Sequence, residues 1–110
     1  FKVCGTGKPL RELIFVDDIA DACIFFMNKK TKSSLINIGT GKDMSIKQYA
    51  NFLIKKLKLK AKIKFDKSKP DGVPKKLLDT TLARKYGWKS KISLDQGFEI
   101  TYKSFLKNNK

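Results

Sequence analysis

Hydrophobic residues recur every three or four positions in four stretches of the chain, a spacing that places them on one face of a helix. We therefore expect helices over residues 18–28, 45–57, 79–86 and 93–106. Ser45 with Gln48 forms a capping-box pattern at the start of the second helix, and Ser93 with Gln96 does so at the start of the last.

The first and third helices have acidic residues at their starts. Asp17 or Asp18 is expected to cap the first helix and Asp79 the third, because a carboxylate suits the positive end of the helix dipole. The positions expected to face the core are Ile19, Ala22, Cys23, Phe26 and Met27, then Ile46, Tyr49, Ala50, Leu53 and Leu57, then Leu94, Phe98, Tyr102, Phe105 and Leu106.

Shorter apolar stretches favour β-strands. Residues 61–65 alternate between apolar and cationic positions, as in a half-buried strand, while residues 10–16 and 35–38 are continuously apolar, as in buried strands. Residues 1–4 form a further short strand. These elements predict an α+β fold class, and a length of 110 residues suits one domain with a modest core.

The composition is that of a globular domain, since 41% of the residues are hydrophobic. No apolar run approaches the roughly 18 residues of a membrane span, and no signal-peptide pattern opens the chain. Cys4 and Cys23 have no metal-ligand spacing and no histidine to join them, so we expect no metal site and a reduced Cys23 in the core. We expect a cytoplasmic protein without a membrane partner.

The strongest global feature is a formal net charge of +15, from 25 basic and 10 acidic residues. Such a charge attracts polyanions, and one interpretation is a non-catalytic cationic module that binds nucleic acid. Specific nucleic-acid recognition is not expected, because only Arg11 and Arg84 offer a bidentate fork. The aromatic residues also occupy apolar helix positions and do not alternate with basic ones.

A rigid, lysine-rich turn occupies residues 68–79. Two prolines fix the backbone on either side of Gly72, which is expected to adopt a positive φ. Asp71 therefore stands on a stiff loop between Lys69 and the Lys75–Lys76 pair. This arrangement suits a ligand that carries both hydroxyl and phosphate groups; the alternative is an ordinary surface turn.

Arg11 is a second candidate binding residue. It follows a Gly-Thr-Gly-Lys-Pro turn and precedes an apolar stretch, so its guanidinium is anchored close to rigid backbone and suits bidentate contact with phosphate. Lys8 adds a positive charge to the same site. The alternative is a surface arginine that pairs with Glu12 or Asp17.

Familiar catalytic chemistry is missing from the chain. It has no histidine, no Walker A loop and no Tyr-x-x-x-Lys dyad. The turns Gly5-Thr6-Gly7 and Gly39-Thr40-Gly41 do not complete a dinucleotide motif, because Pro9 follows the first and Met44 stands at the third glycine position of the second. We expect binding chemistry without a catalytic residue or a cofactor site.

Several motifs together resemble one family across essentially the whole chain. They lie in residues 5–22, 36–41, 65–79, 87–88 and 92–94, in order and without large gaps. The most specific is Ser-Lys-Pro-Asp-Gly followed by Pro-Lys-Lys-Leu-Leu-Asp. This pattern resembles the C-terminal part of the GDP-L-fucose synthases, a branch of the extended short-chain dehydrogenase/reductase superfamily that is also called the NAD-dependent epimerase/dehydratase family.

The resemblance implies an enzyme that epimerises GDP-4-keto-6-deoxy-mannose and reduces it with NADPH to GDP-L-fucose. The family's Rossmann domain, NADP site and Ser/Tyr/Lys catalytic group lie upstream of the part matched here. Residues 1–110 are thus expected to be a C-terminal substrate-binding lobe that is inactive alone and packs on the Rossmann domain of the same chain. The resemblance also implies a homodimer at full length.

Within the family, the residues matched by Arg11 and Asp71 contact the GDP-sugar. Three positions depart from the family pattern: Cys4 stands where a tryptophan commonly lies against the nucleotide, Phe15 replaces a histidine and Lys75 replaces an arginine. The substrate-binding residues expected are Arg11, Asp71, Lys8, Cys4 and Lys75. The alternative within the superfamily is a nucleotide-sugar epimerase, dehydratase or reductase that acts on a different sugar.

Overall fold

The computed structural model describes residues 1–109, which form two compact units. Unit 1 combines Phe1–Glu12 with Lys42–Leu77, and unit 2 combines Leu13–Gly41 with the chain from Leu78 onward. Each unit is therefore assembled from two stretches that are distant in sequence. The 110 residues, whose length suggests one domain, are thus divided between two compact units.

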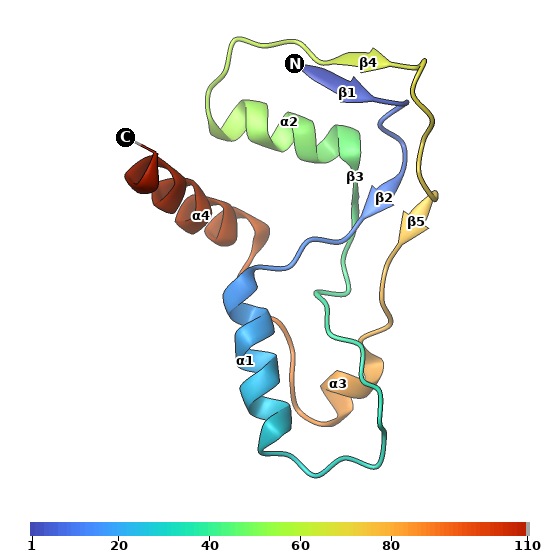
Figure 1. Cartoon of the computed structure of the whole chain (residues 1–110), viewed down its shortest axis with the longest axis vertical. Coiled ribbons are helices and arrows are strands. Elements are labelled where there is room, and N and C mark those ends of the chain that lie inside the picture. Colours follow the sequence, from blue (N-terminus) through green and yellow to red (C-terminus); the bar gives the residue numbers. More distant parts are fainter. Residues whose placement is uncertain (110) are drawn as a thin grey trace. The chain divides into compact units, whose positions relative to one another are not determined.

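The strands of the described chain are short and lie in unit 1 (Figure 1). They are β1 (Lys2–Cys4), β2 (Leu10–Arg11), β3 (Met44–Ser45), β4 (Lys64–Asp66) and β5 (Lys75–Lys76). β1 pairs with β4 in parallel, while β2 lies between β3, to which it is antiparallel, and β5, to which it is parallel. Both sheets therefore join the first stretch of unit 1 to the second.

Helix α2 (Ile46–Lys56) begins directly after β3 in unit 1. The Ser45 hydroxyl accepts a hydrogen bond from the backbone N–H of Gln48 at 3.1 Å, and the Gln48 side chain accepts one from the backbone N–H of Ser45 at 2.7 Å. The predicted capping box is confirmed. Tyr49 then donates its hydroxyl to the carbonyl oxygen of Arg11 at 2.8 Å, which ties α2 to β2.

Unit 2 is helical, with α1 (Val16–Met27), α3 (Thr81–Lys85) and α4 (Leu94–Asn108). Its core consists of Ala22, Ala83 and Trp88, each at most 2% exposed. The second predicted capping box, formed by Ser93 and Gln96, is present at the start of α4. Strands in one unit and helices in both make the chain α+β, as predicted.

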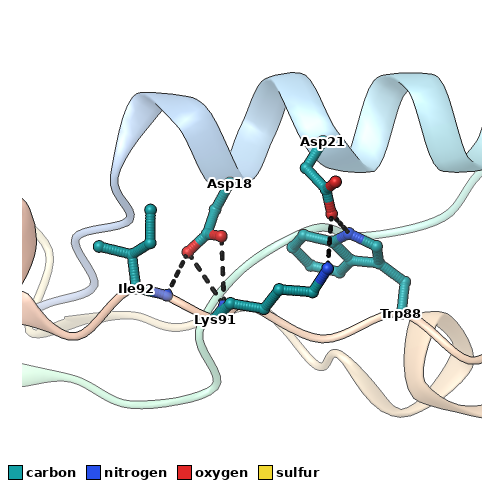
Figure 2. A network of polar contacts seen from close by, with 5 residues as sticks. All are labelled: Asp18, Asp21, Trp88, Lys91 and Ile92. Carbon is teal, nitrogen blue, oxygen red and sulfur yellow. Dashed lines mark hydrogen bonds and ion pairs between the residues drawn. The ribbon is translucent and has the colours of Figure 1, made fainter.

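Two carboxylates on α1 hold the connection between α3 and α4 (Figure 2). Asp18 is buried and accepts hydrogen bonds from the backbone N–H of Lys91, at 3.2 Å to each oxygen, and of Ile92, at 3.0 Å. Asp21 accepts a hydrogen bond from Trp88 Nε1 at 3.0 Å and lies 3.7 Å from the Lys91 ammonium. These charge-assisted contacts fix the connection on the helix.

The predicted cap of α1 is wrong. The N-cap residue is Phe15, which makes no side-chain cap, and Asp17 and Asp18 lie within the first turn. Asp18 accepts hydrogen bonds from backbone N–H groups more than 70 residues away in sequence, and no local pattern predicts such a contact. At α3 the N-cap is Thr80; Asp79 lies one residue earlier and accepts a hydrogen bond from the backbone N–H of Thr81 at 2.9 Å.

Three predicted strands are shorter than expected or absent. Only Leu10–Arg11 of residues 10–16 pairs with other strands, and the strand predicted over 61–65 begins at Lys64. Residues 35–38 form no strand; Ile36 and Ile38 pack against the core of unit 2 instead. A continuous apolar run does not distinguish a strand from an extended segment that packs on helices.

Several helix positions predicted to be in the core are exposed. They are Ile19, Cys23 and Met27 on α1 and Phe105 and Leu106 on α4. Met27 is 83% exposed, and Cys23 is a free thiol on the wall of a surface pocket, not a core residue. Helical spacing predicts a face, but the side chains that would cover that face must come from elsewhere.

Candidate functional site

The candidate site lies in unit 1, where the turn 5–9 meets the loop 68–74. The candidates predicted from the sequence, Cys4, Lys8, Arg11, Asp71 and Lys75, all belong to this unit. Unit 1 contains fifteen of the 25 basic residues and four of the ten acidic residues, so its formal net charge is +11 of the chain's +15. The positive charge is therefore concentrated in the unit that contains the candidate site, which favours an anionic ligand.

Asp71 is held by Thr6, a residue of the turn. The backbone N–H of Thr6 donates to Asp71 Oδ1 at 2.8 Å, and the Thr6 hydroxyl donates to Oδ2 at 2.7 Å. The hydroxyl oxygen of Thr6 in turn accepts a hydrogen bond from the backbone N–H of Lys8 at 3.2 Å. Each oxygen of the exposed Asp71 carboxylate keeps a lone pair for a further donor.

These hydrogen bonds favour the ionised form of Asp71. The pKa of Asp71 is held below its ordinary value chiefly by the backbone N–H of Thr6, next by the Thr6 hydroxyl, and also by the charge of Lys8. At neutral pH the carboxylate is therefore an acceptor of fixed orientation.

Gly5 and Gly7 allow the turn to come this close to the loop. Their φ angles are +79° and +75°, values that residues other than glycine rarely adopt. A Cβ atom on Gly5 would collide with the Asp71 carboxylate, and one on Gly7 would lie 2.6 Å from the Phe65 ring. The space beside both glycines is filled by side chains of unit 1.

The glycine turns do not fit a dinucleotide cofactor. A pyrophosphate needs open space next to the glycine backbone, and in the turn 5–7 that space is taken by Asp71 and Phe65. Gly41, in unit 2, has Arg84 Nη2 at 2.7 Å from the position of its missing Cβ. Both turns serve packing within their own unit.

Arg11 is anchored to the same loop as Asp71. Its Nη1 donates to the carbonyl oxygens of Leu10 at 2.7 Å and Val73 at 2.8 Å, and so the guanidinium is anchored to the backbone. Among residues 1–109, these two hydrogen bonds use Nη1 and leave Nη2 without a hydrogen bond. Gly72 does not adopt the predicted positive φ; a Cβ there would lie 2.8 Å from Arg11 Nη2 and would displace the guanidinium.

The remaining candidates lie at strand ends or in the turn. Cys4 ends β1 opposite Asp66 and is an exposed free thiol, Lys75 begins β5 opposite Leu10, and Lys8 is exposed in the turn. Hydrogen bonds join Asp71 to Thr6 of the turn and Arg11 of β2 to Val73 of the loop. Among residues 1–109, no hydrogen bond or ion pair joins Cys4 or Lys75 to these two.

Sequence reasoning missed two residues that shape the site. Thr6 was treated only as the middle of a glycine turn, and Tyr49 only as part of an apolar helix face. A hydroxyl between two glycines was the available signal for Thr6, because such turns expose backbone N–H groups to acceptors. Nothing local indicates that Tyr49 fixes the carbonyl group of Arg11.

Acidification is expected to destabilise unit 1. The pKa of Asp66 is lowered by the hydroxyl of Ser68 and then by Lys2, whose ammonium lies 3.2 Å from it, and the pKa of Asp71 is lowered as described. Because folding depresses both pKa values, the stabilisation is complete above about pH 4 and is lost as the pH falls through the folded-state values. Urea midpoints at pH 3 and pH 7 should differ less in Asp66→Asn and Asp71→Asn than in the wild type; an undiminished difference contradicts the assignment.

Neither a metal centre nor a membrane-spanning helix is found in residues 1–109. No group of three or more His, Cys, Asp or Glu side chains there is placed to hold a metal ion. None of the described helices is long and apolar enough to cross a membrane.

Comparison with known proteins gives consistent matches. Residues 1–39 match the NAD dependent epimerase/dehydratase family. The chain is 43% identical to GDP-L-fucose synthase from Escherichia coli (strain K12) over 96% of its length, covering 36% of that protein.

Solved structures agree with this match. A GDP-6-OMe-4-keto-L-xylo-heptose reductase from C. jejuni has a TM-score of 0.84 and 35% identity, with 98% of this chain and 34% of that chain covered. UDP-glucose 4-epimerase from Thermotoga maritima, solved with UDP-glucose, has a TM-score of 0.88 and 28% identity, with 99% and 35% covered. The chain thus spans about a third of the length of the proteins that it matches.

Proposed function

We propose that this chain belongs to the NAD dependent epimerase/dehydratase family and is the GDP-sugar-binding C-terminal portion of a GDP-L-fucose synthase-like enzyme. The observation that carries the proposal is the similarity to a GDP-L-fucose synthase along almost the whole chain. The complete enzyme would epimerise GDP-4-keto-6-deoxy-mannose and reduce its keto group with NADPH.

Under this proposal, NADP and the catalytic residues belong to a part of the polypeptide outside these 110 residues. Two observations support the division. The space beside the turn glycines is filled by side chains, and the chain has neither histidine nor a Tyr-x-x-x-Lys dyad. The chain alone is expected to bind the sugar nucleotide and not to turn it over.

The proposed roles follow from the geometry of the site. Arg11 binds the pyrophosphate through the Nη2 side of its fork, and the exposed Lys8 and Lys75 add positive potential. Asp71 accepts a hydrogen bond from a hydroxyl or a ring N–H with its remaining lone pairs. Cys4 stands at the end of β1, where the resemblance to the GDP-L-fucose synthases implies a tryptophan against the nucleotide.

Exposed apolar side chains in unit 2 support a partner domain. They include Val16 at 68%, Ile24 at 63%, Met27 at 83% and Leu35 at 78% exposure, and where such side chains form one patch, the patch is typical of an interaction surface. We propose that the Rossmann domain of the same polypeptide covers them. Free Cys4 and Cys23 suit a reducing compartment, and so we propose that the enzyme is cytoplasmic. A homodimer is proposed from the family resemblance alone.

A second candidate is an enzyme of the same family that acts on a different nucleotide-sugar, and the high TM-score to the UDP-glucose 4-epimerase favours it. The two candidates differ in their choice of base. We expect the native polypeptide that contains this chain to bind GDP at least tenfold more tightly than UDP or dTDP, by isothermal titration calorimetry. Equal or tighter binding of UDP selects the second candidate.

The same titrations address the interpretation as a cationic nucleic-acid-binding module. That interpretation requires an affinity that rises with oligonucleotide length and falls steeply with salt, without preference for a mononucleotide. The proposed function predicts that an oligonucleotide competes with GDP only at low salt.

A further inference from the structure

Among the described residues, Thr6 is the one residue that hydrogen-bonds the Asp71 carboxylate, and it does so to both oxygens. The two residues are 65 positions apart in sequence. The Thr6 hydroxyl also accepts a hydrogen bond from the backbone N–H of Lys8, so its proton is directed toward Asp71 and its lone pair toward Lys8. This single hydroxyl therefore couples the turn, the Asp71 carboxylate and the backbone of a cationic residue.

We propose that Thr6 is a positioning residue of the nucleotide site, which fixes Asp71 so that its two unused lone pairs are open to a donor group of the bound nucleotide. The inference rests on the proposed function and deepens it. Nothing in the proposed mechanism requires Thr6 to touch the ligand; it acts through Asp71.

The physical reason is preorganisation. Asp71 lies on an exposed loop, where an unheld side chain populates several rotamers and must be ordered when a ligand binds. Two hydrogen bonds from one residue select a single orientation before binding. The ligand then meets a carboxylate that is already in place, and the affinity rises without a new contact.

The charge state of Asp71 is set by the same contacts. The charged group that acts on it is Lys8 from the turn, and the Arg11 guanidinium from β2 lies against the neighbouring Gly72. The two Thr6 hydrogen bonds lower the pKa of Asp71 more than Lys8 does. Loss of the Thr6 hydroxyl is therefore expected to raise the pKa of Asp71 part of the way toward its ordinary value, since the backbone hydrogen bond is kept.

The test compares Thr6→Val with Thr6→Ser in the native polypeptide that contains this chain. Valine keeps the branched shape and loses the hydroxyl, whereas serine keeps the hydroxyl. We expect Thr6→Val to raise the Kd for GDP about tenfold, as loss of a charge-assisted hydrogen bond does, and Thr6→Ser to raise it less than threefold. The kcat of the complete enzyme is expected to change much less than KM.

Thr81→Val is the matched control. Thr81 donates its hydroxyl to Asp79 at 2.6 Å and its backbone N–H to the same oxygen at 2.9 Å, and the pKa of Asp79 is lowered first by that hydroxyl. The chemistry is the same, but it lies in unit 2, outside the proposed site. We expect Thr81→Val to leave the Kd for GDP unchanged.

A double-mutant cycle with Asp71→Asn separates positioning from a general structural effect. If Thr6 acts through Asp71, the double variant should bind GDP with the same Kd as Asp71→Asn alone. The loss of GDP affinity that accompanies protonation of Asp71 at low pH should occur at higher pH in Thr6→Val and be absent in Asp71→Asn. The inference is overturned if the fold-changes in Kd of the two single variants multiply in the double variant. It is also overturned if Thr6→Val binds GDP like the wild type.

The failure of the inference can be told apart from the failure of the proposed function. A wild-type protein that does not bind GDP overturns the function. In that case a carboxylate NMR titration still tests the hydrogen bond from the Thr6 hydroxyl to Asp71. If that bond lowers the pKa of Asp71, the pKa rises in Thr6→Val and is unchanged in Thr6→Ser. An unchanged pKa in Thr6→Val overturns the inference in either case.

Discussion

Arg11→Ala is expected to weaken GDP binding by the native polypeptide about a hundredfold, which corresponds to about 2.7 kcal/mol. Two losses combine. Alanine removes the Nη2 side of the fork that we assign to the pyrophosphate. It also removes the Nη1 hydrogen bonds to the carbonyl oxygens of Leu10 and Val73, which hold the loop that carries Asp71.

Two further variants show which loss dominates. Arg11→Lys keeps the charge, but an ammonium cannot donate in the geometry of a planar fork, so we expect a loss of about tenfold. Arg84→Ala removes the other arginine of the chain, which lies in unit 2, and should leave the Kd for GDP unchanged. An Arg11→Ala protein that binds GDP within twofold of the wild type contradicts the assigned role.

Asp18→Ala is expected to destabilise unit 2 by about 3 kcal/mol. The substitution leaves the backbone N–H groups of Lys91 and Ile92 without the carboxylate that now accepts their hydrogen bonds. Asp18 is only 2% exposed, so water does not readily replace it, and an unsatisfied buried donor is costly. Urea unfolding followed by the fluorescence of Trp88, the single tryptophan, measures the change in the unit that contains both groups.

Asp17→Ala supplies the comparison. Asp17 precedes Asp18 in the first turn of α1 and is exposed, so it contributes chiefly through the helix dipole. Its replacement should cost less than about 1 kcal/mol. Equal losses from the two variants would show that Asp18 acts as an ordinary first-turn acid and not as the anchor of the connection between α3 and α4.

Sequence patterns predicted the features that depend on neighbouring residues. Both capping boxes were predicted correctly, because their partners are three residues apart and the pattern contains the whole interaction. The α+β class and the general positions of the four helices also followed from local spacing. The roles of Arg11 and Asp71 stay predictions, but the structure brings both to one part of unit 1, where Asp71 binds Thr6 of the turn and Arg11 binds the carbonyl oxygen of Val73 in the loop that carries Asp71.

The features that were missed depend on partners distant in sequence. Asp18 was expected to cap its own helix, but it binds backbone 73 residues away. Gly72 was expected to provide a positive φ, whereas its importance lies in the space that it leaves for Arg11. Residues 35–38 were predicted to be a strand from their apolar character alone, and they pack on the helical core as an extended segment.

We propose that this chain belongs to an enzyme that makes GDP-L-fucose. The most direct measurement is NADPH oxidation by the native polypeptide that contains the chain, with GDP-4-keto-6-deoxy-mannose as the substrate. We predict that one NADPH is oxidised for each GDP-L-fucose formed, and that no oxidation occurs without the sugar nucleotide. A native polypeptide that leaves both NADPH and the keto-sugar unchanged contradicts the claim.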